Sequence, residues 1–391
     1  MHLHTTYYPQ TESGYYIERF FYSGDEAYSQ QLILYTPLKY KYDKQWLLDN
    51  KEVDIDSVPE LFNKIESLIV KHIKAFRQNK IDDCFAFIIS GKELKSNFTK
   101  NEIIIIEHFT TSIPRTAKVS YKYICDRNQF TFAPIIKLPN DLFFVPNLHS
   151  FARALYESPF YWIMDDKSYQ IKKGESTEEI VLQLLTKYIN NYSLCEKDIK
   201  IKNSSGSEKT DIDVLLVQND TAICFQIKAK QLTELSKQGD INHIEDDFDK
   251  AVKKAYHQGI ESINALKERE KYKFSKTIDG IENDTKFYNI CILSDMFPAI
   301  TTLVSTKSKD ITENGIPVIA FSIFDLDMIL QAVGNSFCNY VAFRTQLEVT
   351  ESVTNEMACL SAYLRQNKGE TVDTITMLLA RDIDERYLSL Q

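Results

Sequence analysis

The C-terminal two thirds of the chain alternates between short apolar runs and longer stretches with apolar residues three and four positions apart. Short runs predict strands, and the longer spacing predicts helices. The predicted elements are a helix at 176–188, strands at 198–201, 212–217 and 222–229, a helix at 244–265, strands at 288–293 and 317–323, and a helix at 324–333. This α-β-β-β-α-β order, with a further strand and helix, predicts an α/β fold with a mixed sheet. Residues 346–391 are expected to form two helices broken at 367–369.

Residues 1–165 mix both patterns and predict a separate α+β domain. Strands are expected at 31–35 and 103–106, with a hairpin formed by 119–125 and 130–136. Ser57 and Glu60 have the spacing of a capping box, and the apolar stripe that follows predicts a helix. The stripe consists of Leu61, Ile65, Leu68, Ile69 and Phe76. A polar stretch at 165–174 then predicts three parts: 1–165, 166–345 and a helical C-terminal extension at 346–391.

Composition places the chain among globular proteins. With 43% hydrophobic and 26% charged residues in 391, broad disorder is excluded. No apolar run approaches the length of a membrane helix, and the N-terminus has no apolar leader segment. The seven cysteines are scattered and lie mostly in apolar runs, which predicts free thiols in a reducing cytoplasm. The seven histidines show no metal-ligand spacing, so no zinc site is expected.

The net charge of −9 argues against a protein that coats nucleic acid. Residues 1–165 hold 19 basic and 20 acidic residues, which leaves 27 basic and 35 acidic residues downstream. The acidity therefore lies in the part where the sequence predicts a nucleic-acid site. A nucleic-acid partner requires that the charges segregate by face.

The most informative segment is the pair of apolar strands around Asn219-Asp220. If these two residues form the hairpin loop, paired residue numbers sum to 439, and Asp213 lies opposite Gln226. Lys228 is two residues beyond Gln226 and points to the same face. The register thus places a carboxylate and an amide about 5 Å apart at Cβ, with an ammonium group on the same face.

This set of groups suits phosphodiester hydrolysis. Mg²⁺ prefers oxygen ligands and keeps several waters, and Mn²⁺ is the alternative ion. Asp213, Gln226 and the backbone carbonyl of Ile227 could supply such oxygens, which would polarise a phosphate and activate a water. Lys228 could orient that water and neutralise charge on the phosphoryl oxygens.

At these residues the sequence resembles the PD-(D/E)xK nuclease superfamily. Asp213 resembles the motif aspartate, and Gln226-Ile227-Lys228 resembles the QxK variant found in Mrr-type restriction endonucleases. The Gly174 to Glu178 segment is similar to the G-x-x-x-E helix of that group, which implies a metal-facing Glu178. Ala251, Ala255 and Gln258 resemble the next helix, whose inward glutamine helps to hold the site. The resemblance covers about residues 170–345 and departs from the strict signature at the neutral Gln226.

Several alternatives remain open at the level of sequence. Asp211 competes with Asp213, because a β-bulge would exchange their positions, and Glu179 competes with Glu178. Asp213 is favoured because it directly precedes a buried run, and Glu178 because it shares a helical stripe with Val181 and Leu185. Gln258 could equally be a surface amide. Lys230, His243 and His257 are further polar candidates, and solvated or structural roles are the simpler interpretation.

The expected function is that of a cytoplasmic Mg²⁺-dependent endonuclease that acts on nucleic acid, with DNA favoured by the resemblance. Restriction or another defence against foreign DNA is the role that the resemblance implies. Residues 1–165 would serve recognition, sensing or assembly with a partner protein, and a homodimer is expected by analogy. The alternative is a catalytically silent nuclease-fold module that binds nucleic acid or a protein, which the acidity and Gln226 favour.

Overall fold

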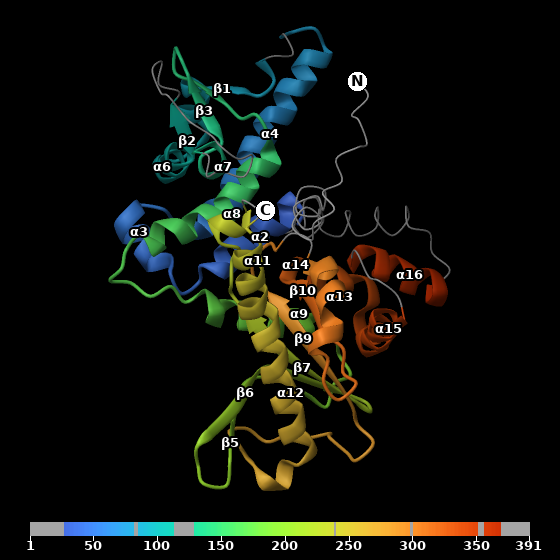
Figure 1. Ribbon diagram of the computed structural model, residues 1–391. Helices are drawn as coiled ribbons and strands as arrows, with labels where there is room; N and C mark the ends of the chain where they lie inside the picture. Colours follow the sequence, from blue (N-terminus) through green and yellow to red (C-terminus); the bar gives the residue numbers. More distant parts are fainter. Residues whose placement is uncertain are drawn as a thin grey trace. The chain divides into compact units, whose positions relative to one another are not determined.

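The computed structural model describes residues 27–81, 85–112, 129–237, 240–297, 300–350 and 356–368 (Figure 1). The chain divides into two compact units, one from Ala27 to Ser176 and the other beginning at Thr177. The division falls just after the polar stretch at 165–174. Both units are mixed α/β structures, each with one mixed sheet. Within the described ranges, no helix is long and apolar enough to cross a membrane.

The N-terminal unit is built from helices around a small sheet. Its helices are α2 (Ser29–Lys39), α3 (Lys44–Lys51), α4 (Val58–Arg77), α5 (Gly91–Asn97), α6 (Lys100–His108), α7 (Gln129–Phe132) and α8 (Leu148–Met164), with a 3₁₀ turn η1 (Ile55–Ser57). Its strands are β1 (Ile88–Ser90), β2 (Thr110–Ser112), β3 (Ile135–Leu138) and β4 (Leu142–Phe144), in the order β1-β4-β3-β2. Helix α2 packs against α4 and α8, and the core of the unit lies there.

Two strands predicted in this unit are wrong, because both segments are helical. Residues 31–35 lie in α2, and residues 103–106 lie in α6. Short apolar runs do not distinguish a buried helix from a buried strand. In α6 the decisive local signal is a capping box, in which Thr99 and Glu102 exchange hydrogen bonds of 2.7 and 3.3 Å.

The other local predictions for this unit are corrected in part. Helix α4 forms as expected, but the Ser57 hydroxyl donates to the Asp54 carbonyl and makes no capping box. Phe76, expected on the buried stripe, is 40% exposed. The first arm and turn of the predicted hairpin lie outside the described residues. In the second arm, residues 130–132 belong to helix α7, and the strand begins only at Ile135.

The C-terminal unit has a six-stranded mixed sheet. Its strands are β5 (Leu194–Lys202), β6 (Glu208–Gln218), β7 (Thr221–Lys228), β8 (Lys273–Phe274), β9 (Lys286–Leu293) and β10 (Ile319–Ser322). The spatial order is β10-β9-β7-β6-β5-β8, with β7, β9 and β10 parallel and the remaining pairs antiparallel. Two neighbouring parallel strands must be joined by a crossover connection, usually a helix, and α12 lies in the connection between β7 and β9.

The helices of this unit are α9 (Lys173–Tyr188), α10 (Glu234–Lys237), α11 (Ile241–Phe248), α12 (Lys254–Lys267), α13 (Ile300–Ile311), α14 (Ile323–Val333), α15 (Phe337–Thr350) and α16 (Glu356–Lys368). A π-helical turn η3 (Asp249–Lys253) joins α11 to α12, and 3₁₀ turns η4 (Arg269–Lys271) and η5 (Gly334–Ser336) follow α12 and α14. The eight elements predicted from the pattern all form, with ends shifted by a few residues. The pattern missed α10, β8 and α13. The predicted break at 367–369 falls at the end of α16, and the second helix predicted after it lies outside the described residues.

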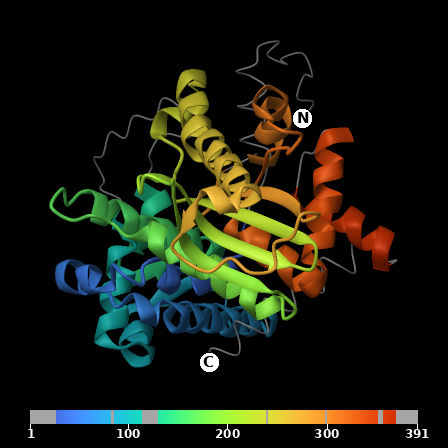
Figure 2. The same cartoon turned by 90° about the horizontal axis from the view of Figure 1, so that it is seen from below.

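Helix α12 lies along one face of the sheet and packs on β6, β7 and β9 (Figure 2). Ile263 and Leu266 of α12 share a buried cluster with Ile199, Ile212 and Leu215 of the strands. On the other face, the ring of Phe225 stacks on Phe337 at the start of α15, with the ring centroids 6.3 Å apart. Burial on both faces fixes the strands that carry the polar residues described next.

Candidate functional site

The β6–β7 hairpin has the register that the sequence predicted. Gln218 pairs with Thr221 across the Asn219-Asp220 loop, and the ladder continues to the pair Val214 and Phe225. Asn219 adopts a left-handed conformation with φ 53°, which a two-residue hairpin loop requires. The ladder ends there, so Asp213 and Gln226 stand at the point where the two strands separate.

The regular side-chain alternation of β6 is interrupted at Asp213. Ile212 and Leu215 belong to the same buried cluster although they are three residues apart, so the side-chain alternation shifts by one residue between them. Across on β5, Asp198 occupies the ladder position opposite Asp213, is unpaired and has a φ of 54°. Left-handed residues other than glycine are frequent next to functional sites, where the surrounding structure holds them in place.

Released from the ladder, the Asp213 carboxylate accepts a hydrogen bond of 2.6 Å from the backbone N–H of Ile227. Ile227 thus takes part through its backbone, while its side chain is buried. The neighbouring Gln226 is completely buried, and its amide nitrogen donates to the Asp211 carbonyl at 3.0 Å. Within the described part of the chain, the amide oxygen of Gln226 has no hydrogen-bond partner. A buried acceptor without a partner is costly and indicates a missing donor or cation.

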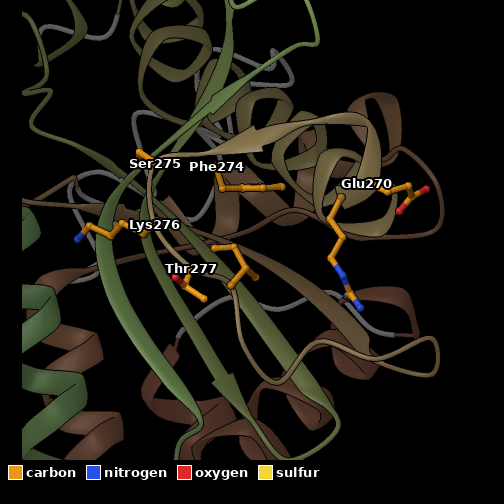
Figure 3. A pocket seen from close by; sticks show the side chains of 7 residues that line it. Glu270, Phe274, Ser275, Lys276 and Thr277 are labelled. Atoms are coloured by element: carbon orange, nitrogen blue, oxygen red, sulfur yellow. The ribbon is translucent and has the colours of Figure 1, made fainter.

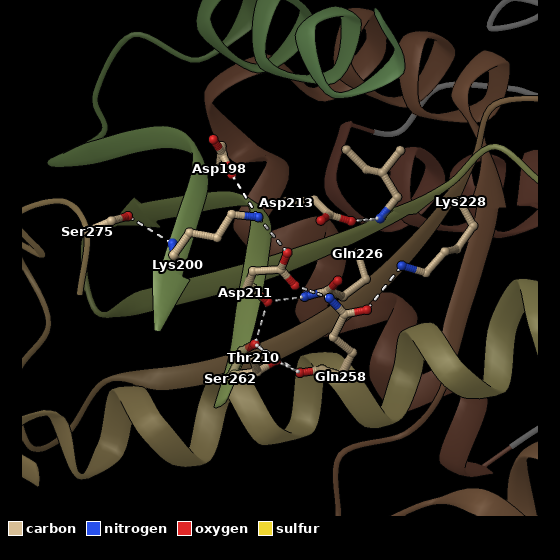
Figure 4. A network of polar contacts seen from close by, with 11 residues as sticks. Asp198, Lys200, Thr210, Asp211, Asp213, Gln226, Lys228, Gln258, Ser262 and Ser275 are labelled. Carbon is tan, nitrogen blue, oxygen red and sulfur yellow. Dashed lines mark hydrogen bonds and ion pairs between the residues drawn. The ribbon is translucent and has the colours of Figure 1, made fainter. Parts of the chain in front are cut away.

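A chain of polar contacts links the ammonium groups of Lys228 and Lys200 across the site (Figure 4). Lys228 donates to the side-chain oxygen of Gln258 at 3.1 Å, and the Gln258 amide nitrogen donates to the Asp211 carboxylate. The other Asp211 oxygen binds Lys200 at 3.0 Å, and Lys200 also contacts Asp198 at 3.2 Å. Gln258 of α12 therefore lies between Lys228 and Asp211 and holds both.

Helix α9 adds the carboxylate of Glu178. Val181 and Leu185 on the same helix are fully buried, which fixes the side of α9 that Glu178 shares. Burial and, next, the negative charge of Asp213 raise the pKa of Glu178 to about 7. The pKa of Asp213 is also raised, because burial outweighs the nearby Lys228 and the Ile227 N–H. Since the charge of Asp213 raises the pKa of Glu178, a cation between the two carboxylates would stabilise both.

The rival acid Asp211 lies at the same site but in a different role. Both of its carboxylate oxygens are engaged by side chains, namely Lys200 and Gln258. Asp213 makes one hydrogen bond, to a backbone N–H, which leaves its other oxygen available. Asp211 therefore supports Gln258, while Asp213 is the carboxylate with an oxygen available to a cation.

Sequence reasoning missed Lys200 and Asp198. Lys200 pairs directly with Asp211 in the β5–β6 ladder, so the register would have revealed it. That register was hidden because the strands are joined by a longer connection and shift by one residue between Ile201 and Lys202. The lesser candidates all have carboxylate partners within 3 Å. Lys230 contacts the buried Asp247 at 2.8 Å. His243 contacts Asp240 and His257 contacts Glu313, both at 2.9 Å.

The donor set fits a hard divalent cation. Two carboxylates, from Glu178 and Asp213, and the unpartnered amide oxygen of Gln226 are the oxygen ligands that Mg²⁺ or Mn²⁺ accepts alongside water. In the ranges that the structure describes, no three His, Cys, Asp or Glu side chains gather closely enough to hold a metal by themselves. The amide oxygen and water would therefore have to complete the coordination.

Comparison with known proteins identifies no family. No protein-family model matches the chain, and no curated protein does. The crystal structure of protein VC1899 from Vibrio cholerae aligns with 83% of this chain at 10% sequence identity and a TM-score of 0.25. This chain covers 58% of that protein, less than two thirds of its length. At such a TM-score the alignment supports neither a fold nor a function.

Proposed function

We propose that the C-terminal unit is a metal-dependent nuclease that hydrolyses phosphodiester bonds, with Mg²⁺ or Mn²⁺ as the cofactor. The observation that carries the proposal is the meeting of four elements at one point. Helix α9 supplies Glu178, β6 supplies Asp213, β7 supplies Gln226 and Lys228, and α12 supplies Gln258. The resemblance of these residues to the QxK form of the PD-(D/E)xK signature supports the same conclusion.

Each residue has a distinct task in this mechanism. Asp213, Glu178 and Gln226 would hold the cation, which, when bound, polarises the phosphate and lowers the pKa of a water. Lys228 orients that water and offsets negative charge as it develops on the phosphoryl oxygens. Gln258 keeps Lys228 in place through its 3.1 Å hydrogen bond, and it is itself oriented by Asp211. Gln258 is therefore a positioning residue.

The wider role follows from the resemblance. We propose DNA as the substrate and restriction or defence against foreign DNA as the purpose. The unit formed by residues 27–176 would serve recognition, sensing or assembly, and a homodimer would provide two sites for a double-strand break. The free cysteines of the described residues, Cys195, Cys224, Cys291, Cys338 and Cys359, are consistent with a cytoplasmic location.

The alternative is a silent module with a nuclease-like site that binds nucleic acid or a protein. Lys200 favours it, because its ammonium already neutralises Asp198 and Asp211 without a metal ion. The neutral Gln226 also removes one charge from the expected metal ligands.

Incubation with plasmid DNA, single-stranded DNA and RNA in Mg²⁺ or Mn²⁺ tests the proposal. Cleavage by the wild type that is lost in Lys228→Ala is the expected result. Lys286→Ala is the matched control, since it removes a lysine at the opposite end of the same sheet. Equal products from wild type and Lys228→Ala, or no products with any substrate, would favour the silent module.

A further inference from the structure

The edge of the large sheet beside the candidate site carries an unusual concentration of positive charge. The segment 267–276, which covers η4 and β8, holds five basic and two acidic residues in a chain with a net charge of −9. Its basic members Lys267, Arg269, Lys271 and Lys273 are exposed. A local excess of +3 on an acidic protein marks a surface for an anionic partner.

Two lysines on this edge stand directly opposite each other. Lys202 of β5 pairs with Lys273 of β8 in the antiparallel ladder, and both side chains are exposed. Directly opposed like charges destabilise a sheet. Glu208 is the other ladder neighbour of Lys202, yet among the described residues neither lysine forms an ion pair within 4 Å. The arrangement becomes favourable when an anion lies across the pair.

A shallow pocket adjoins this pair. It has a volume of about 630 Å³, within the usual range for ligand sites, and lies between η4 and the chain after β8. Figure 3 shows the Phe274 ring and Thr277 in the pocket between these two segments, while Lys276 points away from the ring. Lys276 instead contacts Glu196 at 2.8 Å, so the cation of the pocket is Arg269. One Arg269 nitrogen donates to the Ile281 carbonyl at 2.7 Å, which leaves its other donors for a ligand, and Glu270 lines the pocket beside it.

The edge is connected to the candidate site through Lys200. The backbone N–H of Lys200 donates to the Ser275 hydroxyl, and the Ser275 N–H donates to the Lys200 carbonyl, both at 2.9 Å. Lys202 follows Lys200 by two residues, or about 7 Å along the strand. That distance corresponds to about two nucleotides of a B-form strand.

We propose that this edge binds the sugar–phosphate backbone of the nucleic acid whose scissile phosphate lies at the candidate site. Lys202 and Lys273 contact successive phosphates, and Arg269 contacts the next one at the mouth of the pocket. Phe274 provides an aromatic surface for an unpaired base beside it. This inference rests on the proposed nuclease function and adds the direction in which the substrate leaves the site.

Binding of labelled 20-nucleotide single-stranded and duplex DNA, measured by fluorescence anisotropy in chelator so that nothing is cleaved, tests the inference. The full-length double variant Lys202→Gln/Lys273→Gln is compared with the control Lys187→Gln/Lys286→Gln, which loses the same charge elsewhere in the unit. We expect the test variant to bind at least about fivefold more weakly than the control. The slope of log affinity against log salt should fall by about two.

Thermal unfolding of the same variants separates binding from folding. Removal of two opposed like charges should leave the melting temperature of Lys202→Gln/Lys273→Gln equal to or above that of the wild type. A loss of binding without a loss of stability is therefore the expected signature. Affinities of the test and control variants that agree within twofold would overturn the inference.

Phe274→Leu distinguishes the two forms of the ligand. If an unpaired base lies beside the ring, single-stranded DNA should bind at least about fivefold more weakly, with duplex binding unchanged. Equal affinity of Phe274→Leu and the wild type for single strands would overturn the base contact.

The cleavage and binding experiments together separate the two proposals. If the wild type cleaves and Lys228→Ala does not, while Lys202→Gln/Lys273→Gln binds DNA as tightly as Lys187→Gln/Lys286→Gln, only the proposed DNA contact of the sheet edge is wrong. If the wild type neither binds nor cleaves, the nuclease function fails as well.

Discussion

The two ends of the β6–β7 hairpin carry the same types of residue in opposite physical states. At the loop end, Asp220 pairs with Lys286 at 2.8 Å, both side chains are more than half exposed, and the lysine lowers the pKa of Asp220. At the other end, burial raises the pKa of Asp213 although Lys228 is nearby. The comparison shows that exposure to solvent, and not residue type, decides whether the pKa of an aspartate near a lysine is lowered or raised.

The sharpest test of this contrast is a pair of lysine substitutions. Lys228→Ala should reduce the cleavage rate at least about 100-fold, because it removes a charge that stabilises the transition state in a partly buried site. Lys286→Ala should leave the rate unchanged. Both variants should retain the wild-type unfolding midpoint closely, since neither lysine fills the core. Equal rates for Lys228→Ala and the wild type would place the chemistry elsewhere.

A second test adds a negative charge at Gln226, in the buried end of the β6–β7 hairpin. Gln226→Glu replaces an amide that donates to the Asp211 carbonyl by a carboxylate that cannot donate, in a completely buried position. In chelator we expect a loss of about 2 kcal/mol in the free energy of unfolding. Mg²⁺ should restore more stability in this variant than in the wild type, because a further carboxylate attracts the ion.

Calorimetric Mg²⁺ titrations and urea unfolding measure both effects of Gln226→Glu. Combining it with Asp213→Asn should remove most of the Mg²⁺ gain, because the two side chains would no longer share one ion. Gln218→Glu is the matched control at the loop end of the same hairpin, where Gln218 is also buried. Identical Mg²⁺ responses in wild type and Gln226→Glu would show that this side chain takes no part in metal binding.

A third test uses pH. The pKa of Glu178 is about 7 in the folded protein against 4.5 for an ordinary glutamate. Between these values the folded state keeps a proton that the unfolded state has released, so stability should fall as the pH rises from 4.5 to 7 and then level off. Urea unfolding in chelator should show this fall, and Glu178→Gln should flatten it. Added Mg²⁺ should lower the pKa and weaken the fall in the wild type.

The smallest expected effect compares the two aspartates directly. The raised pKa of Asp213 means that its charge is disfavoured in the fold, so Asp213→Asn should raise the unfolding midpoint at pH 8. The lowered pKa of Asp220 means that its charge is favoured, so Asp220→Asn should lower the midpoint slightly at pH 8, and this difference should shrink as the pH falls from 3.8 through the lowered pKa. Chemical unfolding at pH 8 and across this lower range provides the measurement. Shifts of the same sign would contradict the proposed difference in environment.

Prediction from sequence succeeded where local and tertiary signals agreed. Four strands of the C-terminal unit, β5, β6, β7 and β9, have 8 to 11 residues, so their apolar pattern was long enough to identify them, whereas the two-residue strand β8 was missed. In the N-terminal unit, four consecutive isoleucines at 103–106 favoured a strand by propensity, yet the capping box of Thr99 and Glu102 and burial of Ile105 and Ile106 produced a helix. A short apolar run without a long-range partner in view leaves both outcomes open.

The sequence alone determined the hairpin, its loop and its pairing up to Val214 and Phe225, because a two-residue loop sets the register of both strands. It also determined that Asp213, Gln226 and Lys228 belong to one end of that hairpin. Only the tertiary structure decided which contacts these three side chains make and how deeply they are buried. The interrupted alternation at Asp213, the ion pair of Lys200 with Asp211, and the hydrogen bond from Lys228 to Gln258 depend on contacts between different strands and helices. Such contacts form when helices and strands pack, and that packing sets both the burial and the pKa of each carboxylate.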